Sequence, residues 1–92
     1  PIYITENGIA DASDELRKKF IPAALNAMEH AIADGANVRG YFYWSLLDNF
    51  EWDKGYWLRF GLVAVDRTTQ QRTIRESARQ YSSLVATYRA EN

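Results

Sequence analysis

The spacing of apolar residues changes several times along the chain, and each spacing predicts a different element. Residues 2–5 form a short apolar run rich in β-branched and aromatic side chains, which predicts a strand. Between residues 16 and 32, apolar side chains recur every three or four positions, which predicts a helix with one apolar face. That face consists of Leu16, Phe20, Ala24 or Leu25, Met28 and Ile32. Residues 38–45 are apolar on both faces, which is typical of a strand buried in a parallel sheet.

Residues that commonly start and end helices flank the helix predicted between residues 16 and 32. Ser13 is a good N-cap, and Asp14 and Glu15 are favourable in a first helical turn. Pro22 interrupts the apolar repeat, so either the helix kinks there or a new helix starts near it. Gly35 is a suitable residue for the end of the helix.

The second half of the chain is less regular. Residues 46–58 form a long aromatic and acidic loop, residues 60–65 indicate a short strand, and residues 66–71 a polar turn. Residues 72–74 are expected to pair back as a small hairpin. Helical spacing then continues towards the C-terminus through Ile74, Ala78, Tyr81, Val85 and Tyr88.

The order strand, helix, strand, helix predicts an α/β fold with parallel strands, because a helical crossover returns the chain in the same direction. Two such units make a quarter of an eight-fold βα (TIM) barrel. We expect the even-numbered side chains of both strands to face the barrel interior, namely Ile2, Ile4, Glu6, Gly40, Phe42 and Trp44. Glu6 and Trp44 would then lie at the rim where such barrels have their active sites. The chain also starts directly in a strand, and we expect it to be part of a longer protein.

Glu6 is the first candidate for chemistry. It ends the first predicted strand and is followed at once by the turn residues Asn7 and Gly8. A glutamate at a strand end is often only solvated or paired with an arginine. The functional alternative is a nucleophile or proton donor, since glycosidases use two carboxyl groups that flank the scissile bond.

The aromatic loop is the second candidate. Nine of the chain's aromatic residues lie between positions 41 and 60, and the tryptophans among them flank acidic residues. Core packing explains the aromatics of the predicted strand. Indole rings beside carboxylates are suited to hold a sugar, because a ring stacks on a pyranose face and a carboxylate accepts hydroxyl protons. For Asp48 and Asn49, hydrogen bonds that shape the loop backbone are the favoured interpretation.

Composition narrows the function further. The net charge is −1 and there is no basic stripe, so neither nucleic acid nor an anionic membrane surface is an expected partner. The chain has no cysteine and no apolar run of about 20 residues, which fits a reducing compartment and a cytoplasmic location. His30 has no partner at metal-ligand spacing, and the arginines and lysines of the first helix are expected to be solvated.

These motifs resemble family 1 of the retaining β-glycosidases. The order of the stretches T-E-N-G and W-S-L-x-D-N-x-E-W is specific to that family, and the similarity covers nearly the whole chain. The matching segments are residues 4–8, 38–42, 44–52, 55–56 and 59–63, with Asp66, residues 69–70 and residues 77–78.

The resemblance implies a role for five residues. Glu6 corresponds to the catalytic nucleophile at the end of the seventh barrel strand, and Trp44 to the floor under the sugar. Glu51 resembles the residue that binds the 4- and 6-hydroxyls, Trp52 the donor to the 3-hydroxyl, and Phe60 an aromatic residue near the 6-carbon. The family's acid/base glutamate follows an asparagine in Asn-Glu-Pro, and this chain has no such motif.

The resemblance therefore implies that residues 1–92 are the C-terminal (βα)7–8 portion of one TIM-barrel domain. The completed enzyme would hydrolyse terminal β-glucoside-type linkages without metal or cofactor. Its partners would be the β-glycoside substrate and either the rest of the barrel or another copy of this chain, and the chain alone would be inactive. The alternative is a non-catalytic barrel fragment that self-associates or acts as a scaffold. A carbohydrate-binding module is less favoured, because such modules are usually all-β.

Overall fold

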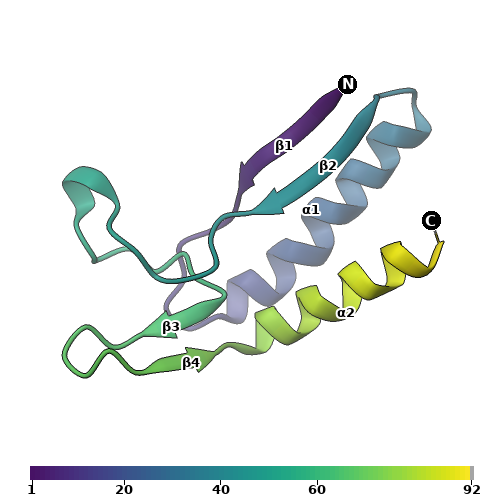
Figure 1. Cartoon of the computed structure of the whole chain (residues 1–92). Coiled ribbons are helices and arrows are strands. Elements are labelled where there is room, and N and C mark those ends of the chain that lie inside the picture. The colour runs from purple at the N-terminus through teal and green to yellow at the C-terminus, as the bar shows by residue number, and fades with distance from the viewer. Residues whose placement is uncertain (92) are drawn as a thin grey trace.

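The computed structural model of the protein describes residues 1–91, and it contains the predicted strand–helix–strand–helix order (Figure 1). The elements are β1 (Ile2–Asn7), α1 (Glu15–Ala33), β2 (Val38–Tyr43), the short 3₁₀ helix η1 (Trp52–Lys54), β3 (Val63–Val65), β4 (Arg72–Ile74) and α2 (Glu76–Glu91). β1 and β2 pair in parallel, whereas β3 and β4 form a separate antiparallel pair. The parallel pairing and the hairpin at residues 72–74 are therefore confirmed. The strands expected at 38–45 and 60–65 are shorter than predicted.

The start of α1 differs from the prediction. The N-cap is Asp14, not Ser13, and Asp14 has φ 70° and makes no side-chain capping hydrogen bond. Asp11 supplies much of the cap instead, because its carboxylate accepts a hydrogen bond from the backbone N–H of Leu16 at 2.8 Å. The Ser13 hydroxyl accepts a longer one from the N–H of Glu15 at 3.3 Å. The Asp14 carboxylate does not cap the helix because it accepts hydrogen bonds from Arg17 and Ser77 instead.

α1 then runs through Pro22 as one helix, so the alternative of a new helix starting there is wrong. Its end agrees with the prediction. Gly35 has φ 105°, a backbone conformation that favours glycine, and its N–H donates to the carbonyl of Ile32 at 3.0 Å.

The buried face of α1 is displaced from the predicted one. Its buried residues are Arg17, Ile21 and Leu25, while Leu16 is 55% exposed and Ile32 is 42% exposed. Two other predicted members do pack against the core, namely Phe20 and Met28. The apolar repeat includes Leu25, Phe20 and Met28 correctly but omits Arg17, because hydrophobicity alone assigns an arginine to solvent.

The register of β1 against β2 contains two irregularities. The paired residues are Ile2 with Val38, Tyr3 with Gly40, Ile4 with Tyr41, and Asn7 with Tyr43. Tyr3 therefore shares a face with Gly40, and a Cβ atom on that glycine would lie 2.9 Å from the Tyr3 ring. The prediction that Ile4 shares one face with Gly40 is wrong, because Ile4 pairs with Tyr41 and strict alternation assumes a register without bulges.

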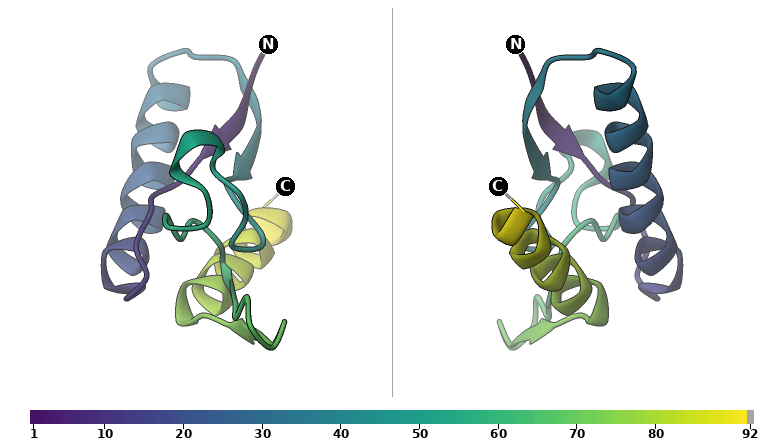
Figure 2. Two further views of the ribbon diagram at one scale, coloured as in Figure 1. Left: turned by 90° about the vertical axis from the view of Figure 1, so that its left-hand side faces the viewer. Right: turned by 90° about the vertical axis from the view of Figure 1, so that its right-hand side faces the viewer.

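The hydrophobic core lies between the β1–β2 pair and the two helices, on one side of the strands (Figure 2). It is small, and its buried apolar side chains are Ile21, Leu25, Tyr43, Leu62 and Val65. On the strands, Tyr3 and Phe42 are each 59% exposed. The radius of gyration is 14.4 Å, whereas a self-contained domain of this length would have about 12 Å. Within residues 1–91, the face of the strands opposite the helices is uncovered, whereas Ile4 and Trp44 are half-buried.

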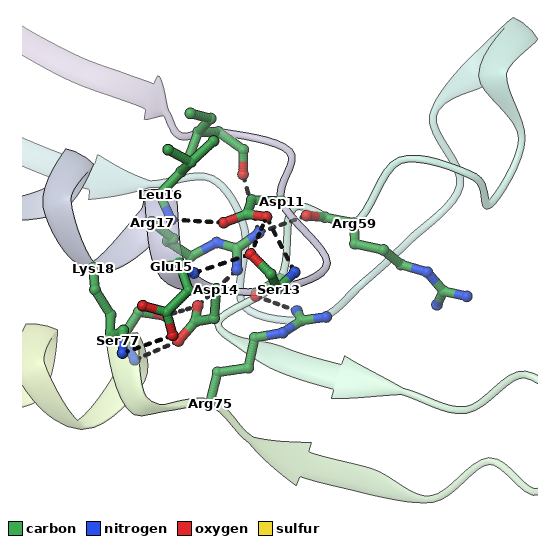
Figure 3. A network of polar contacts seen from close by, with 12 residues as sticks. Asp11, Ser13, Asp14, Glu15, Leu16, Arg17, Lys18, Arg59, Arg75 and Ser77 are labelled. Atoms are coloured by element: carbon green, nitrogen blue, oxygen red, sulfur yellow. Dashed lines mark hydrogen bonds and ion pairs between the residues drawn. The ribbon is translucent and has the colours of Figure 1, made fainter.

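Arg17 organises the polar framework that holds these elements together (Figure 3). It is fully buried, which contradicts the expectation of a solvated helix face. Its Nε donates to the Tyr43 hydroxyl at 3.1 Å and its Nη1 to Asp14 at 2.7 Å. Its Nη2 donates to the carbonyls of Ile9 at 3.1 Å and Arg59 at 2.6 Å. One side chain thus joins α1, the end of β2 and two loops.

Asp14 extends this framework to α2. Its carboxylate accepts hydrogen bonds from the Ser77 backbone N–H at 2.9 Å and from the Ser77 hydroxyl at 2.6 Å. Burial alone would raise the pKa of the Asp14 carboxyl, but the hydrogen bonds from Ser77 and Arg17 outweigh burial and lower that pKa. The N-termini of both helices are therefore fixed to each other at the same end of the strands.

Neither helix of residues 1–91 has the length and apolar character needed to cross a membrane.

Candidate active site

Glu6 is the second-last residue of β1, which ends at Asn7, and its side chain is exposed. Among residues 1–91, no hydrogen bond or ion pair involves its carboxylate. The neighbouring backbone is well fixed, because the Trp44 N–H donates to the Asn7 carbonyl at 2.9 Å. Glu6 is therefore a carboxylate without a partner, held on a backbone that is tied to the next strand.

Gly8 allows the two strand ends to come so close. A Cβ atom at this position would lie 1.8 Å from the carbonyl oxygen of Trp44, so no other residue fits without a shift of the backbone. Besides forming the predicted turn with Asn7, Gly8 therefore allows the end of β1, which carries Glu6, to approach the backbone at Trp44.

Trp44 and Glu51 are in direct contact. The indole Nε1 of Trp44 donates to the Glu51 carboxylate at 3.1 Å. The peptide bond between Trp44 and Ser45 is cis. The Ser45 N–H donates to the Phe60 carbonyl at 3.2 Å, which brings the backbone of Phe60 to the same region. The structure therefore links Trp44, Glu51 and Phe60 by short hydrogen bonds next to the end of β1.

Trp52 is less closely joined to this group. It starts η1, has φ 47° and is 83% exposed. No hydrogen bond or ring contact among residues 1–91 connects its indole to Glu6, Trp44 or Glu51. Figure 1 shows this loop extending away from the strands. Of the five predicted site residues, only Trp44 and Glu51 are joined by a side-chain hydrogen bond among residues 1–91.

Asp48 holds the loop that carries these residues. It is 2% exposed and accepts hydrogen bonds from the N–H groups of Gly61 at 2.9 Å and Val65 at 3.2 Å. Arg75 donates to both of its oxygens, at 2.8 and 3.1 Å. Burial would raise the pKa of the Asp48 carboxyl, but these donors outweigh it and lower that pKa. The prediction that Asp48 shapes the loop is confirmed.

Two structural residues of this region were missed from sequence, namely Arg17 and Arg75. Arg75 connects the start of α2 with the aromatic loop, because it bonds Asp48 and also donates to the Gly61 carbonyl at 2.5 Å. In the sequence, the only hint of Arg75's role was that Asp48, predicted to shape the loop, has no obvious basic partner close to it. Its partner lies 27 residues away, and local spacing does not reveal such a pair.

The arrangement has the parts of one half of a sugar site. It offers one unpaired carboxylate at a strand end, an indole ring, and a second carboxylate fixed by that indole. Among residues 1–91, no three His, Asp or Glu side chains gather as metal ligands would. The two carboxylates are suited to different tasks, because Glu6 has no partner and Glu51 is already oriented by a donor.

Comparison with known proteins agrees with these features. The model of glycosyl hydrolase family 1 matches residues 1–90. β-Glucosidase 47 of Arabidopsis thaliana is 47% identical over 95 residues, which cover 97% of this chain and 18% of that protein. The structure of the hyperthermophilic β-glucosidase from Pyrococcus furiosus has a TM-score of 0.92 at 46% identity and covers 95% of this chain and 18% of its own. The family 1 β-glucosidase from Thermotoga maritima has a TM-score of 0.83 at 42% identity and covers 91% and 21%.

These solved relatives are TIM barrels, and this chain matches one continuous part of them. It spans about a fifth of the length of the proteins that it resembles. Because the family model covers almost every residue and the identities exceed 40%, the chain belongs to glycosyl hydrolase family 1.

Proposed function

We propose that residues 1–92 supply the last two βα units, (βα)7–8, of the TIM barrel of a retaining β-glycosidase that hydrolyses terminal β-linked, β-glucoside-type residues. Glu6 is the nucleophile in this proposal. The observation that carries it is the exposed Glu6 carboxylate at the carboxyl end of a parallel strand, without a partner among residues 1–91 and next in sequence to Asn7, whose carbonyl accepts from the Trp44 N–H.

The chemistry follows the retaining double displacement. The Glu6 carboxylate attacks the anomeric carbon, and the glycosidic bond breaks as a glutamate outside this chain protonates the leaving oxygen. The same outside glutamate then removes a proton from water, whose oxygen attacks the anomeric carbon and releases Glu6. The mechanism needs no metal or cofactor.

Glu51 and Trp44 would bind the sugar rather than break its bond. The indole of Trp44 already fixes one Glu51 oxygen, so the carboxylate is oriented before substrate arrives. Glu51 would accept the 4- and 6-hydroxyl protons, Trp52 would donate to the 3-hydroxyl, and Phe60 would lie near the 6-carbon. Trp52, which is 83% exposed here, would need the rest of the enzyme to orient it.

The partner of this chain would be the remainder of the barrel. Tyr3 and Phe42, each 59% exposed on the strands, would be covered by neighbouring barrel strands and side chains. Self-association of a non-catalytic fragment is the second candidate, and the same uncovered face favours it. The cytoplasmic location stays a prediction from the lack of cysteine.

A chimera tests the proposal. Residues 1–92 replace the 21% of the Thermotoga maritima β-glucosidase that the chain matches, and hydrolysis of an aryl β-glucoside is measured. We expect an active enzyme, and we expect azide to rescue a Glu6→Gly variant and to form a glycosyl azide of inverted configuration. An active Glu6→Gly chimera without azide would show that Glu6 is not the nucleophile.

The isolated chain separates the two candidates. Residues 1–92 alone should not hydrolyse the aryl glucoside, because the second carboxyl group is absent. Sedimentation should show association or poor folding rather than a stable monomer, because an uncovered sheet face and free strand edges favour association. A discrete inactive oligomer, together with an inactive chimera, would favour the scaffold.

A further inference from the structure

Asn7, the residue that follows Glu6, is held by Tyr41 in β2 and by Trp44 just after β2. The Tyr41 hydroxyl donates to the Asn7 side-chain oxygen at 2.7 Å, and the Trp44 N–H donates to the Asn7 main-chain oxygen at 2.9 Å. Both donors belong to the chain that runs through β2 to the indole of the site. Asn7 is therefore fixed through its side chain and through its backbone, whereas Glu6 is fixed through neither side-chain hydrogen bonds nor ion pairs among residues 1–91.

The register explains why this clamp concerns Glu6. Ile4 pairs with Tyr41 and Asn7 pairs with Tyr43, so β1 uses three steps where β2 uses two. The extra residue lies between Ile4 and Asn7, and Glu6 is part of this bulge. A bulge locally re-aims side chains and interrupts the ladder, so its conformation depends on what holds its ends. The Tyr41 hydrogen bond is a side-chain contact at one of these ends.

Tyr41 itself is fixed from the helix side. Its ring packs against the hydrophobic core and lies 6.4 Å from the ring of Tyr81 in α2, centroid to centroid. Burial, with smaller contributions from Tyr81 and Tyr43, raises the pKa of Tyr41 to about 12, so its phenol keeps its proton in neutral solution. Asn7 thus accepts its hydrogen bond from a protonated phenol whose ring packs against the core.

We propose that Tyr41 is a positioning residue for Glu6. Its hydroxyl holds the Asn7 side chain on the helix side of the sheet, and this fixes the bulge in the form that turns the Glu6 carboxylate towards the opposite, open side. Tyr41 touches no substrate and acts only through Asn7. The inference rests on the proposed function, because it assigns Tyr41 a part in the reactivity of Glu6.

The matched variants are Tyr41→Phe and Tyr43→Phe in the chimera described above. Both remove one phenol oxygen from the same strand. The Tyr43 hydroxyl accepts hydrogen bonds from Arg17 and from the Ile9 N–H in the structural framework, whereas the Tyr41 hydroxyl donates to Asn7, the residue next to Glu6. We expect Tyr41→Phe to lower kcat by roughly 10- to 100-fold with KM changed less than about threefold, since small displacements of a reacting group cost rate rather than binding. Tyr43→Phe should lower the melting temperature more and kcat less.

The rate of covalent trapping by a 2-deoxy-2-fluoro β-glucoside, followed by intact mass, gives a readout that a packing defect alone does not change. Tyr41→Phe should slow this trapping as much as it lowers kcat. Equal trapping rates in Tyr41→Phe and the parent chimera would overturn the inference. It would also be overturned if both tyrosine variants lost kcat in the same proportion to their loss of melting temperature.

A double-mutant cycle with Asn7→Ala tests the route. If Tyr41 acts through Asn7, Tyr41→Phe should have little further effect on trapping in the Asn7→Ala background. Independent, multiplicative losses would overturn the inference. Failure of the proposed function is distinct from this, because it would appear as an active Glu6→Gly chimera without azide, whatever Tyr41→Phe does.

Discussion

Four carboxylates of this chain form two pairs with opposite surroundings, namely Asp14 with Asp48 and Glu6 with Glu51. Asp14 and Asp48 are buried, and each accepts hydrogen bonds from an arginine and from backbone N–H groups. Glu6 has no partner among residues 1–91, and Glu51 has one, the indole of Trp44. A buried charge is tolerated only when it is paired and hydrogen-bonded. The donors that Asp14 and Asp48 require come from different helices and loops, so these acids hold those elements together. In the proposed site, a substrate would supply donors to the two acids with spare acceptor capacity, Glu6 and Glu51.

The largest expected effect is that of Glu6→Gln in the chimera. Hydrolysis of an aryl β-glucoside should fall by roughly 10⁴-fold or more, because the covalent step is lost. The melting temperature should stay within error of the parent value, since no contact among residues 1–91 is removed. A variant with near-normal turnover would remove Glu6 from the group of functional acids.

Asp48→Asn should show the reverse pattern. Arg75 would keep its charge beside a neutral amide in a buried site, and we expect a loss of about 3–5 kcal/mol in unfolding free energy, the usual consequence of breaking a buried pair. The measurement is the urea unfolding midpoint of the chimera. Glu15→Gln is the matched control, because Glu15 pairs with Lys18 at 3.1 Å on the exposed surface of α1, and it should leave the midpoint unchanged. Equal midpoints for Asp48→Asn and the parent would contradict a structural role for Asp48.

The two groups also differ in how far sequence predicts them. The order of elements, the position of Glu6 at the end of a strand and the loop-shaping Asp48 followed from apolar spacing and from motifs, which are local. The register of β1 and the burial of Arg17 did not follow, because both depend on residues far apart in sequence. Arg17 is buried by partners 26 and 42 residues away, and a bulge cannot be counted from the alternation of one strand. The network that positions the site is therefore harder to predict than the site itself.

Glu51→Ala should have an intermediate effect on activity. We expect kcat/KM to fall by roughly 10²-fold, from the loss of one or two charge-assisted hydrogen bonds that tighten in the transition state. A substrate without the 4-hydroxyl should be penalised much less by this variant than the natural glucoside. Comparing the two substrates in parent and variant checks the assignment. An equal penalty for both would show that Glu51 does not bind the 4-hydroxyl.

The smallest expected effect is on the acid side of the stability curve. The pKa of the Asp14 and Asp48 carboxyls in the folded state lies below the ordinary value of 3.8. Such groups stabilise the fold at pH values above the ordinary pKa, and this contribution is lost as the pH falls through that value towards the lowered pKa of the folded state. We therefore expect the melting temperature of the chimera to fall below about pH 4, where unfolded carboxyls take up protons. Asp48→Asn should flatten this fall, because one of the two groups no longer titrates, whereas Glu15→Gln should leave its steepness unchanged. Melting curves at a series of pH values between about 6 and 2.5 would check this, and an equally steep fall in Asp48→Asn and the parent would show that Asp48 contributes no acid-labile stability.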